Sequence, residues 1–470
     1  MASSFRRLGA LIAVVTLLGA ACGGSTSSAP TASESAAPSE AGVVEIRWYC
    51  CLGGGGVDET MATEDAAVAA FNDAHPNIHV TREVVAYQAA RDQLSQEISG
   101  DNAPDIVGPV GVGGSEAFHG QWLDLTDLIA STNYDLSQYA EGTVDFYNVG
   151  GEGQIGLPFA VYPTILFYQK DMFEEAGLNE PPHNYGDQYE MPDGSMVDWD
   201  YETIDEIAKL MTVDANGNNA TDAAFDAANV VQFGFEPYRD DVRGLGANFG
   251  AGSLVAADGK TVEIPSEWEA AWEWYYGAMW EDHTVMQGAQ FDSDEFNPEG
   301  YPFCTARVAM EINYLWSTYC LGGAGENWDI AAVPSYNGTT TAPLNADTFR
   351  IMKESKHPAE AFEFLTYLLG DGSQDLLQVY GGLSAREAQQ DAFFAGLDES
   401  YPYEVDWQVA KASLAFADNP NWEAFMPAYN ETLDRLNIFG TKLRVEGTLD
   451  LGAEIDTLTT DIQAIWDAAK

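Results

Sequence analysis

The hydrophobic and polar positions near the start of the chain alternate between the patterns of strands and helices. Residues 43–49 read nearly as apolar and polar in turn, as a strand with one buried face does, and the glycines at 53–56 end this strand. Residues 64–74 repeat apolar side chains at the spacing of an amphipathic helix that ends before His75-Pro76. The pattern continues with a strand at 78–81, a helix at 89–99 and a strand beginning at 104–107. Strands that alternate with helices predict an α/β domain with a largely parallel sheet.

Two later segments carry large apolar side chains at helical spacing. In the last of them, the pattern predicts a helix with a buried face made of Ile455, Leu458, Ile462 and Ile465. The other stripe consists of Trp268, Trp272, Tyr275, Tyr276 and Met279. We expect this stripe in the core rather than against a ligand, because an apolar stripe on a helix is ordinarily the face that packs inward.

Several short segments occur in an order that resembles a known family. They are residues 71–78 (FNDAHPNI), 103–107 (APDIV), 156–161 (GLPFAV), 166–178 (LFYQKDMFEEAGL), 306–310 (ARVAM), 328–334 (WDIAAVP) and 356–362 (KHPAEAF). In this order they resemble the family 1 extracellular solute-binding proteins, the maltose-binding-like receptors of ABC importers. The resemblance extends over nearly the whole chain after residue 42.

The resemblance implies a two-lobed, periplasmic-binding-protein-like α/β fold with crossing hinge strands. The crossings are expected near residues 157–165, 341–347 and 381–386. Lobe 1 would then comprise residues 43–158 completed by 346–382, and lobe 2 residues 159–345 completed by 383–470. Residues 181–199 look like an insertion, which would lie either at the rim of the cleft or on the surface without a role.

The N-terminal segment has the pattern of an exported lipoprotein. Residues 1–21 contain two arginines followed by an uncharged apolar stretch that is too short to span a bilayer, as in a signal peptide. Cys22 follows in a sequence that resembles a lipobox, except that Gly19 stands where a bulky residue is usual. Residues 22–42 are small and polar and predict a disordered tether. We therefore expect a location in the cell envelope, outside the cytoplasmic membrane and lipid-anchored, with plain secretion as the alternative.

The charge of the chain is strongly negative. It has 20 basic and 74 acidic residues and a formal net charge of -54. This balance argues against nucleic acid as a partner and against electrostatic binding to anionic lipid, so a membrane contact would need the lipid anchor. The acidity could serve to capture a cation, but solubility is the interpretation that we favour.

The cysteines suggest disulfides rather than a metal site. Cys304 and Cys320 flank one segment and are candidates for a local disulfide, which an exported protein permits. The adjacent Cys50 and Cys51 could bond to each other or elsewhere, because connectivity cannot be read from the sequence. No Cys-x-x-Cys pair occurs, so a zinc site is not expected.

The sequence offers little catalytic chemistry. It contains neither Gly-x-Ser-x-Gly nor His-Glu-x-x-His. Residues 151–156 match Gly-x-Gly-x-x-Gly, but Leu157-Pro158 leads into a strand rather than a helix, so we interpret this segment as a hairpin. We expect a binding protein without a cofactor rather than an enzyme; the alternatives are a secreted carbohydrate-active enzyme and a structural lipoprotein.

One segment resembles a calcium loop. Asp214, Asn216, Asn218 and Asp222 place oxygen atoms at the spacing of such a loop, although its usual glycine and its final glutamate are absent. The hypothesis is a structural Ca²⁺ site, and the alternative is a polar turn between a helix and a strand.

The ligand site is predicted mainly from the resemblance. Trp316 stands at the position of a sugar-stacking tryptophan of the family, and Tyr238 resembles another aromatic ligand contact. Tyr162 lies on the first expected crossing strand. The further candidates lie in loops after predicted strands or near the later crossings: Gly54, Gly55, Ser115, Glu116, His119, Asn313, Asn345 and Asp347.

Aromatic faces and planar polar groups together are typical of sites for sugars. We therefore expect a small hydrophilic ligand, most simply a sugar or oligosaccharide, with a polyol, a glycerol phosphodiester or a peptide as alternatives. Few basic residues lie near the expected cleft, which disfavours a polyanion. The partners would be the permease subunits of an ABC transporter, and we expect the protein to be a monomer.

Overall fold

The structure is a computed structural model that describes residues 42–139, 144, 147–149, 152–238, 241–298 and 301–469. The predicted signal peptide, Cys22 and the tether up to residue 41 lie outside the described residues. Residues 43–470 form one compact unit. Among the described residues, no helix combines the length and the apolar character needed to cross a membrane.

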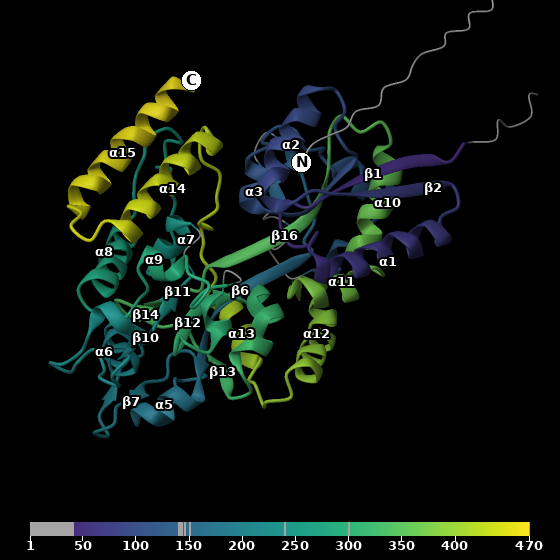
Figure 1. The fold of residues 1–470 in the computed structure, drawn as a ribbon. Helices are drawn as coiled ribbons and strands as arrows, with labels where there is room; N and C mark the ends of the chain where they lie inside the picture. Colours follow the sequence, from purple (N-terminus) through teal and green to yellow (C-terminus); the bar gives the residue numbers. More distant parts are fainter. Residues whose placement is uncertain are drawn as a thin grey trace, which may run out of the picture. The chain divides into compact units, whose positions relative to one another are not determined.

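A nine-stranded mixed sheet runs through this unit (Figure 1). Its strands are β1 Val44–Cys50, β2 Ile78–Val84, β3 Ile106–Gly111, β6 Ala160–Gln169, β11 Glu236–Pro237, β12 Met310–Tyr314, β13 Trp328–Ala331, β16 Leu344–Ile351 and β17 Leu383–Ser384. They lie in the order β11, β12, β6, β16, β3, β1 and β2, with β13 and β17 also paired to β6. β1 is parallel to β2 and β3, whereas β16 is antiparallel to β3 and β6. The α/β class predicted from the sequence is confirmed, but the sheet is mixed rather than largely parallel, because β6 and β16 pair antiparallel with their neighbours.

β6 connects the two halves of the sheet. Residues 160–163 of this strand pair with β16, and residues 164–169 pair with β12 and β13. β17 pairs with the start of β6 at Ala160 and Val161. The strands β6, β16 and β17 thus lie at the three expected crossings, and the two-lobed fold with crossing strands is confirmed. The exact boundaries of the lobes stay a prediction.

The first half of the sheet is covered on both faces. Its helices are α1 Asp58–Ala74, α2 Tyr87–Ser99, α10 Pro358–Leu369 and α11 Ser373–Tyr380. Trp48 of β1 packs with α1, α10 and α11 in one core, and the next residue, Tyr49, packs with Leu94 of α2 in another. Successive side chains of a strand point to opposite faces, so one buried strand supplies both cores.

The second half carries the helices α6 Tyr201–Met211, α8 Ser266–Trp280, α14 Tyr429–Val445 and α15 Leu451–Ala468. Trp268, Trp272, Tyr275 and Met279 of α8 are buried together in one large core, and Tyr276 packs against it partly buried, so the predicted core role of this stripe is confirmed. In α15 the buried face is Ile455, Leu458, Ile462 and Trp466, and Ile465 is partly buried at its edge.

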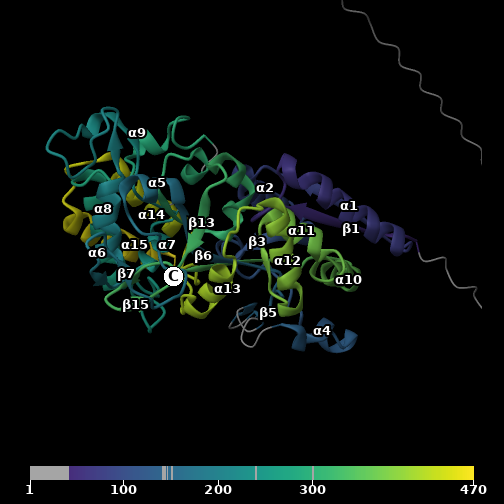
Figure 2. The ribbon, with the colours of Figure 1, turned by 90° about the horizontal axis from the view of Figure 1, so that it is seen from below.

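Helices α12 Glu387–Ser400 and α13 Gln408–Ser413 cover β6 near the crossing (Figure 2). Their side chains pack with Ile165 and Phe167 of β6. A disulfide joins Cys304 and Cys320 in the same region. The crossing strand is therefore held in a packed core rather than in an open linker.

The remaining α-helices and strands are short. They are α3 Val112–Glu116, α4 Thr126–Thr132, β4 Asn148–Val149, β5 Gly153–Gln154, α5 Lys170–Ala176, β7 Tyr189–Glu190, β8 Met196–Val197, β9 Val213–Asp214, β10 Val230–Gln232, α7 Val242–Ala247, α9 Gly288–Phe291, β14 Ser335–Tyr336 and β15 Thr339–Thr340. β4 and β5 form the hairpin predicted at the glycine-rich motif. The insertion at 181–199 forms the hairpin of β7 and β8, and its Tyr189 and Trp199 are buried in the same core as the α8 stripe.

Candidate functional site

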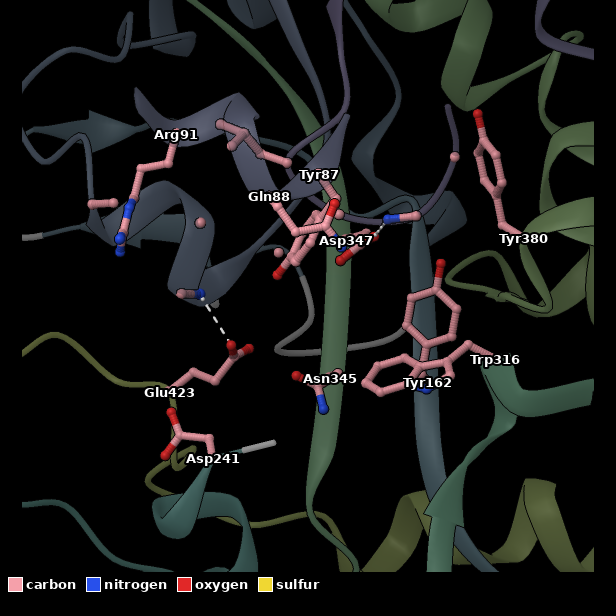
Figure 3. A pocket seen from close by; sticks show the side chains of 18 of the residues that line it. Tyr87, Gln88, Arg91, Tyr162, Asp241, Trp316, Asn345, Asp347, Tyr380 and Glu423 are labelled. Atoms are coloured by element: carbon pink, nitrogen blue, oxygen red, sulfur yellow. Dashed lines mark hydrogen bonds between the residues drawn. The ribbon is translucent and has the colours of Figure 1, made fainter. Parts of the chain in front are cut away.

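A cavity of about 760 Å³ lies between the two halves of the sheet (Figure 3). On the side of the first half of the sheet, its lining includes the loop after β1, the start of α2, the junction of β3 and α3, and the end of α11. The crossing strands β6 and β16 also contribute. On the side of the second half, the lining includes α7, α14 and the segment before α14. A cavity of this volume holds a small organic ligand. The site is thus built from both halves at the place where β6 and β16 cross.

One side of the cavity is aromatic, and we call Tyr162, Tyr238, Trp316 and Tyr380 the aromatic wall. The ring of Trp316 lies 5.2 Å from that of Tyr162 and 5.5 Å from that of Tyr238, measured between centroids. The hydroxyl of Tyr162 and the indole nitrogen of Trp316 are buried without a hydrogen-bond partner among the described residues. This wall offers ring faces together with polar atoms that a ligand could satisfy.

Asn345 and Asp347 of β16 lie between the two sides of the cavity (Figure 3). Both are 7% exposed. Asp347 Oδ2 accepts a hydrogen bond of 3.0 Å from the backbone N–H of Gly54. Burial raises the pKa of Asp347 to about 6. At Gly53, a Cβ atom would lie 2.6 Å from Asp347 Oδ2, so the close approach of this loop to the carboxylate requires glycine there.

The opposite side carries charges, and we call Asp241, Arg243 and Glu423 the charged wall. Asp241 precedes α7, accepts a hydrogen bond from the backbone N–H of Arg243 and forms an ion pair with its guanidinium at 2.7 Å. The guanidinium carbon of Arg243 lies 5.3 Å from the ring of Trp422 and 5.7 Å from that of Tyr429, within the range of cation–π contacts. Arg243 is 2% exposed, so this ion pair is buried.

Glu423 is the least satisfied group of the charged wall. Its Oε1 accepts a hydrogen bond of 3.2 Å from the backbone N–H of Gly113, and its Oε2 is buried with no partner among the described residues. Burial raises the pKa of Glu423 to about 8, and Asp241 and Asp347 add to this effect while Arg243 opposes it. The carboxyl group is therefore largely protonated at neutral pH.

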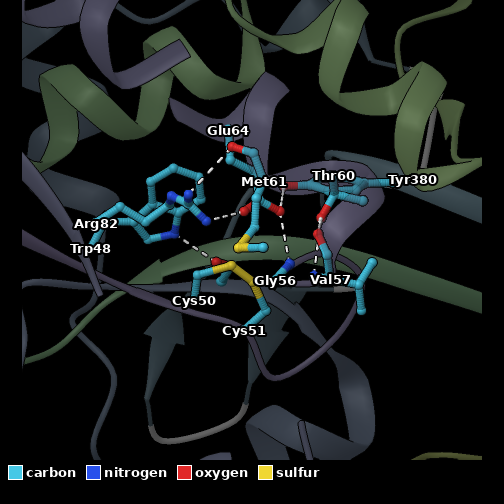
Figure 4. The surroundings of a disulfide bond; sticks show 12 residues. Trp48, Cys50, Cys51, Gly56, Val57, Thr60, Met61, Glu64, Arg82 and Tyr380 are labelled. Atoms are coloured by element: carbon cyan, nitrogen blue, oxygen red, sulfur yellow. Dashed lines mark hydrogen bonds and ion pairs between the residues drawn. A yellow bond between two sulfur atoms is a disulfide. The ribbon is translucent and has the colours of Figure 1, made fainter. Parts of the chain in front are cut away.

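The buried Glu64 holds Tyr380 of the aromatic wall in place through a hydrogen bond (Figure 4). Glu64 of α1 is fully buried; it accepts hydrogen bonds from the Tyr380 hydroxyl at 3.0 Å and from the backbone N–H of Gly56 at 2.8 Å. It also forms an ion pair with Arg82 of β2. The sulfur atoms of Cys50 and Cys51 are bonded to each other beside this network, which answers the question that the sequence left open.

Most of the residues expected from the sequence line the cavity. They are Gly54, Gly55, Tyr162, Tyr238, Trp316, Asn345 and Asp347. Of the aromatic wall, Tyr380 was not predicted, because it lies at the end of a helix whose pattern is that of a core element.

Four predicted residues do not line the cavity. Asn313 is buried in the sheet, where its amide donates to Glu311 and its oxygen accepts from the N–H of Tyr314. Ser115 is also buried, and its hydroxyl donates to the carbonyl of Val112. Glu116 is the buried last residue of α3, and His119 just after it has its Nδ1 2.5 Å from Glu152 Oε1. The prediction placed these side chains in the cleft, but α3 turns Gly113, Gly114 and Ala117 toward the cavity instead.

The charged wall was missed altogether. Other lining residues without a prediction include Thr60, Tyr87, Gln88, Arg91, Tyr301, Trp422, Tyr429, Leu433 and Asn437. The low number of basic residues offered a signal. With only 20 basic residues in the chain, each arginine could have been considered as a possible partner of a cleft carboxylate. Arg243 stands two residues after an aspartate and could have been singled out on that ground.

In the predicted calcium loop, the carboxylate of Asp214 already accepts hydrogen bonds from neighbouring residues. Asp214 Oδ1 accepts from the backbone N–H groups of Asn216 at 2.8 Å and Asn218 at 2.9 Å. Its Oδ2 accepts from the Asn218 amide at 3.0 Å and from the N–H of Asp226 at 2.9 Å, and Asp222 accepts from the N–H of Asn219. These hydrogen bonds hold the pKa of Asp214 low. The carboxylate oxygen atoms of Asp214 are occupied by hydrogen-bond donors, whereas a bound cation would need their lone pairs. This favours the alternative of a polar turn between α6 and β10.

Two lobes joined by crossing strands, with a polar and aromatic cavity between them, define a receptor for a small solute. Residues 66–395 match the family described as bacterial extracellular solute-binding protein, and the chain belongs to that family. The resemblance found in the sequence is thereby confirmed.

Relatives agree with this assignment. The chain is 26% identical over 325 residues to the arabinooligosaccharide-binding protein of Bacillus subtilis, covering 67% of this chain and 68% of the relative. It is 21% identical over 321 residues to an uncharacterized lipoprotein of Streptomyces antibioticus, covering 66% of this chain but less than two thirds, 64%, of that protein. An ABC substrate-binding protein from Listeria monocytogenes in complex with cycloalternan shares the fold, with a TM-score of 0.68 at 18% identity over 90% of this chain and 99% of that one. Family and fold neighbours are thus binding proteins, including sugar-binding components of ABC transporters.

Proposed function

We propose that this protein is a lipid-anchored receptor that binds a sugar or oligosaccharide in the cavity and delivers it to the permease of an ABC importer. The observation that carries the proposal is the aromatic wall opposite polar side chains. Rings such as Trp316 stack on the apolar face of a pyranose, while Asn345 and Asp347 can hydrogen-bond its hydroxyl groups. The relatives that bind an arabinooligosaccharide and cycloalternan support the same ligand class.

The mechanism is closure of the two lobes around the ligand, without covalent chemistry. The hinge would be formed by β6, β16 and β17, which cross between the lobes. A ligand that contacts both the aromatic wall and the charged wall is stabilised most when the lobes approach each other. The closed form would then dock on the permease.

The anchor belongs to the same proposal. Cys22 would be acylated after removal of residues 1–21, and residues 22–42 would tether the receptor near the membrane. A relative that carries the name lipoprotein supports this location. Replacing Cys22 with Ser should release the protein into the medium, whereas retention of the variant in the membrane fraction would contradict the anchor.

Binding is tested with variants of Trp316. The chain without residues 1–42 is titrated calorimetrically with a panel of sugars and oligosaccharides, and each mixture is then examined by mass spectrometry for products. For any ligand found, Trp316→Ala should weaken binding by about 30-fold, since a central aromatic contact contributes about 2 kcal/mol. Trp316→Phe keeps a ring and should recover most of the affinity. Sugar products would argue for an enzyme, and an absence of binding across the panel would contradict the sugar proposal.

A further inference from the structure

Two carboxylates face the cavity without a cation of their own. The third, Asp241, is neutralised by Arg243, whose guanidinium lies 2.7 Å from it. The remaining cation of the lining, Arg91, donates to Asn430 Oδ1 at 3.2 Å. Within the described lining, Asp347 and Glu423 therefore stand without a paired positive charge.

The same two carboxylates are short of hydrogen-bond donors. Among the described residues, Asp347 accepts one hydrogen bond, from the N–H of Gly54, and Glu423 accepts one, from the N–H of Gly113. A carboxylate can accept about four. Both residues line the cavity, so a ligand bound there can supply donors that the protein does not.

Other buried polar atoms in the lining also lack partners. The hydroxyl of Tyr162, whose side chain is 2% exposed, and the amide nitrogen of Asn345, which is 7% exposed, have no hydrogen-bond partner among the described residues. Both residues line the cavity: Tyr162 belongs to the aromatic wall, and Asn345 lies between the two walls (Figure 3). Buried polar groups are rarely left in this state, so these atoms mark where a ligand completes the site.

We propose that the ligand is a sugar that carries a protonated amino group, with the ammonium between Glu423 and Asp347 and the ring against the aromatic wall. This inference rests on the proposed function, because it specifies which sugars the receptor selects. An ammonium group supplies three donors and one positive charge, which are the two things that the carboxylates lack.

Electrostatics favours the amine over a hydroxyl at this position. Burial raises the pKa of Glu423 to about 8 and that of Asp347 to about 6, so their surroundings disfavour the charged forms of both groups. A neutral sugar offers hydroxyl donors but no charge to reverse this effect. A cation does reverse it, and a hydrogen bond between ionised groups is about twice as strong as one between neutral groups. Closure of the lobes increases the difference, since it removes water from the pair.

The test compares sugars that differ at one group. Glucose, galactose and mannose are each paired with the 2-amino sugar, and cellotriose is paired with the trisaccharide of glucosamine. Calorimetric titrations at pH 6.5 keep the amines protonated. In at least one pair, the amino sugar should bind more tightly by about 30-fold or more, the loss expected when a buried charge pair is broken. Binding should also release a proton from Glu423, visible as a dependence of the heat on the ionisation enthalpy of the buffer.

Glu423→Gln identifies the carboxylate responsible. The amide keeps an oxygen for the N–H of Gly113 but removes the charge, so the preference for the amine and the released proton should both disappear. Glu431→Gln, at an exposed position of α14 outside the cavity lining, removes the same charge and should keep the preference. The melting temperature of each variant reports whether it folds.

The outcomes separate this inference from the proposed function. If neutral sugars bind as tightly as their amino partners, or if Glu423→Gln keeps the preference, the amino-sugar inference is wrong and the sugar receptor stands. If no member of any pair binds, both are contradicted.

Discussion

The two walls of the cavity hold their side chains in place by different forces. On the aromatic wall, Trp316 touches three other rings, those of Tyr162, Tyr238 and Tyr314, and each contact is a weak packing interaction. On the charged wall, Asp241 and Arg243 depend on each other, and Glu423 depends on the net charge of its neighbours. Losing one ring leaves the other rings in contact, whereas losing one charge leaves its partner buried and uncompensated.

This difference suggests that the aromatic wall and the charged wall have separate roles in binding. Aromatic faces accept many sugars because every pyranose has an apolar face, so the aromatic wall supplies affinity with little selectivity. Buried charges reject a ligand that cannot pair with them, so the charged wall supplies selectivity. The predictions that follow test this contrast by changing the walls separately.

The largest effect is expected when the cation of the charged wall is removed. Arg243→Met should lower the free energy of unfolding by about 3 kcal/mol, because Asp241 would remain buried without its partner. Arg307 provides a matched control, since it also forms an ion pair and lies 5.6 Å from a ring centroid, but its side chain is 42% exposed. Arg307→Met should cost less than about 1 kcal/mol. Urea unfolding measures both, and equal losses would show that burial does not distinguish the two pairs.

The aromatic wall could be predicted from the sequence more readily than the charged wall. Trp316, Tyr162 and Tyr238 fall at positions that resemble family contacts or on an expected crossing strand, and a large aromatic side chain at such a position has few other roles. Glu423, by contrast, is one of 74 acidic residues in the chain and lies in a segment without regular structure before α14. Its role depends on the approach of Gly113, which is 310 positions away in the chain. No local pattern encodes that contact.

The helices and strands could be predicted where the periodicity of apolar residues defines them. The errors concern which side of a short helix faces the cavity. Strand and helix positions from 43 to 111 follow from alternation and helical spacing, although α1 begins at Asp58, six residues before the predicted start. The prediction for Ser115, Glu116 and His119 failed because it located the loop correctly but not the side of α3 that faces the cavity. A helix as short as α3, with five residues, has no apolar stripe from which its orientation can be read.

A smaller effect is expected from pH, through the same wall. In the unfolded chain Glu423 titrates near its ordinary pKa of 4.5, and in the folded protein near about 8. Between these values the folded state holds a proton that the unfolded state has released, so the free energy of unfolding decreases as the pH rises through this window. Glu423→Gln lacks this dependence, so its stability relative to that of the natural protein should increase from pH 5 to pH 8. Denaturant unfolding at pH 5 and pH 8 measures the difference; parallel curves for the two proteins would contradict a buried, largely neutral Glu423.

The smallest effect is expected from a single methyl group between the two walls. At Gly54, a Cβ atom would lie 3.6 Å from the Tyr162 hydroxyl and 3.7 Å from Asp347 Oδ2, ordinary contact distances, so Gly54→Ala should fold with nearly unchanged stability. The methyl group would occupy space in the cavity and should weaken ligand binding by about fivefold, close to 1 kcal/mol. Gly53→Ala adds the same group one residue earlier, where Cβ would lie 2.6 Å from Asp347 Oδ2 and 3.0 Å from the carbonyl of Pro109. It should therefore shift Asp347 and reduce both stability and affinity more than Gly54→Ala does. If Gly54→Ala leaves affinity unchanged, the ligand does not reach the loop after β1, and the polar contacts must come from β16 and the charged wall alone.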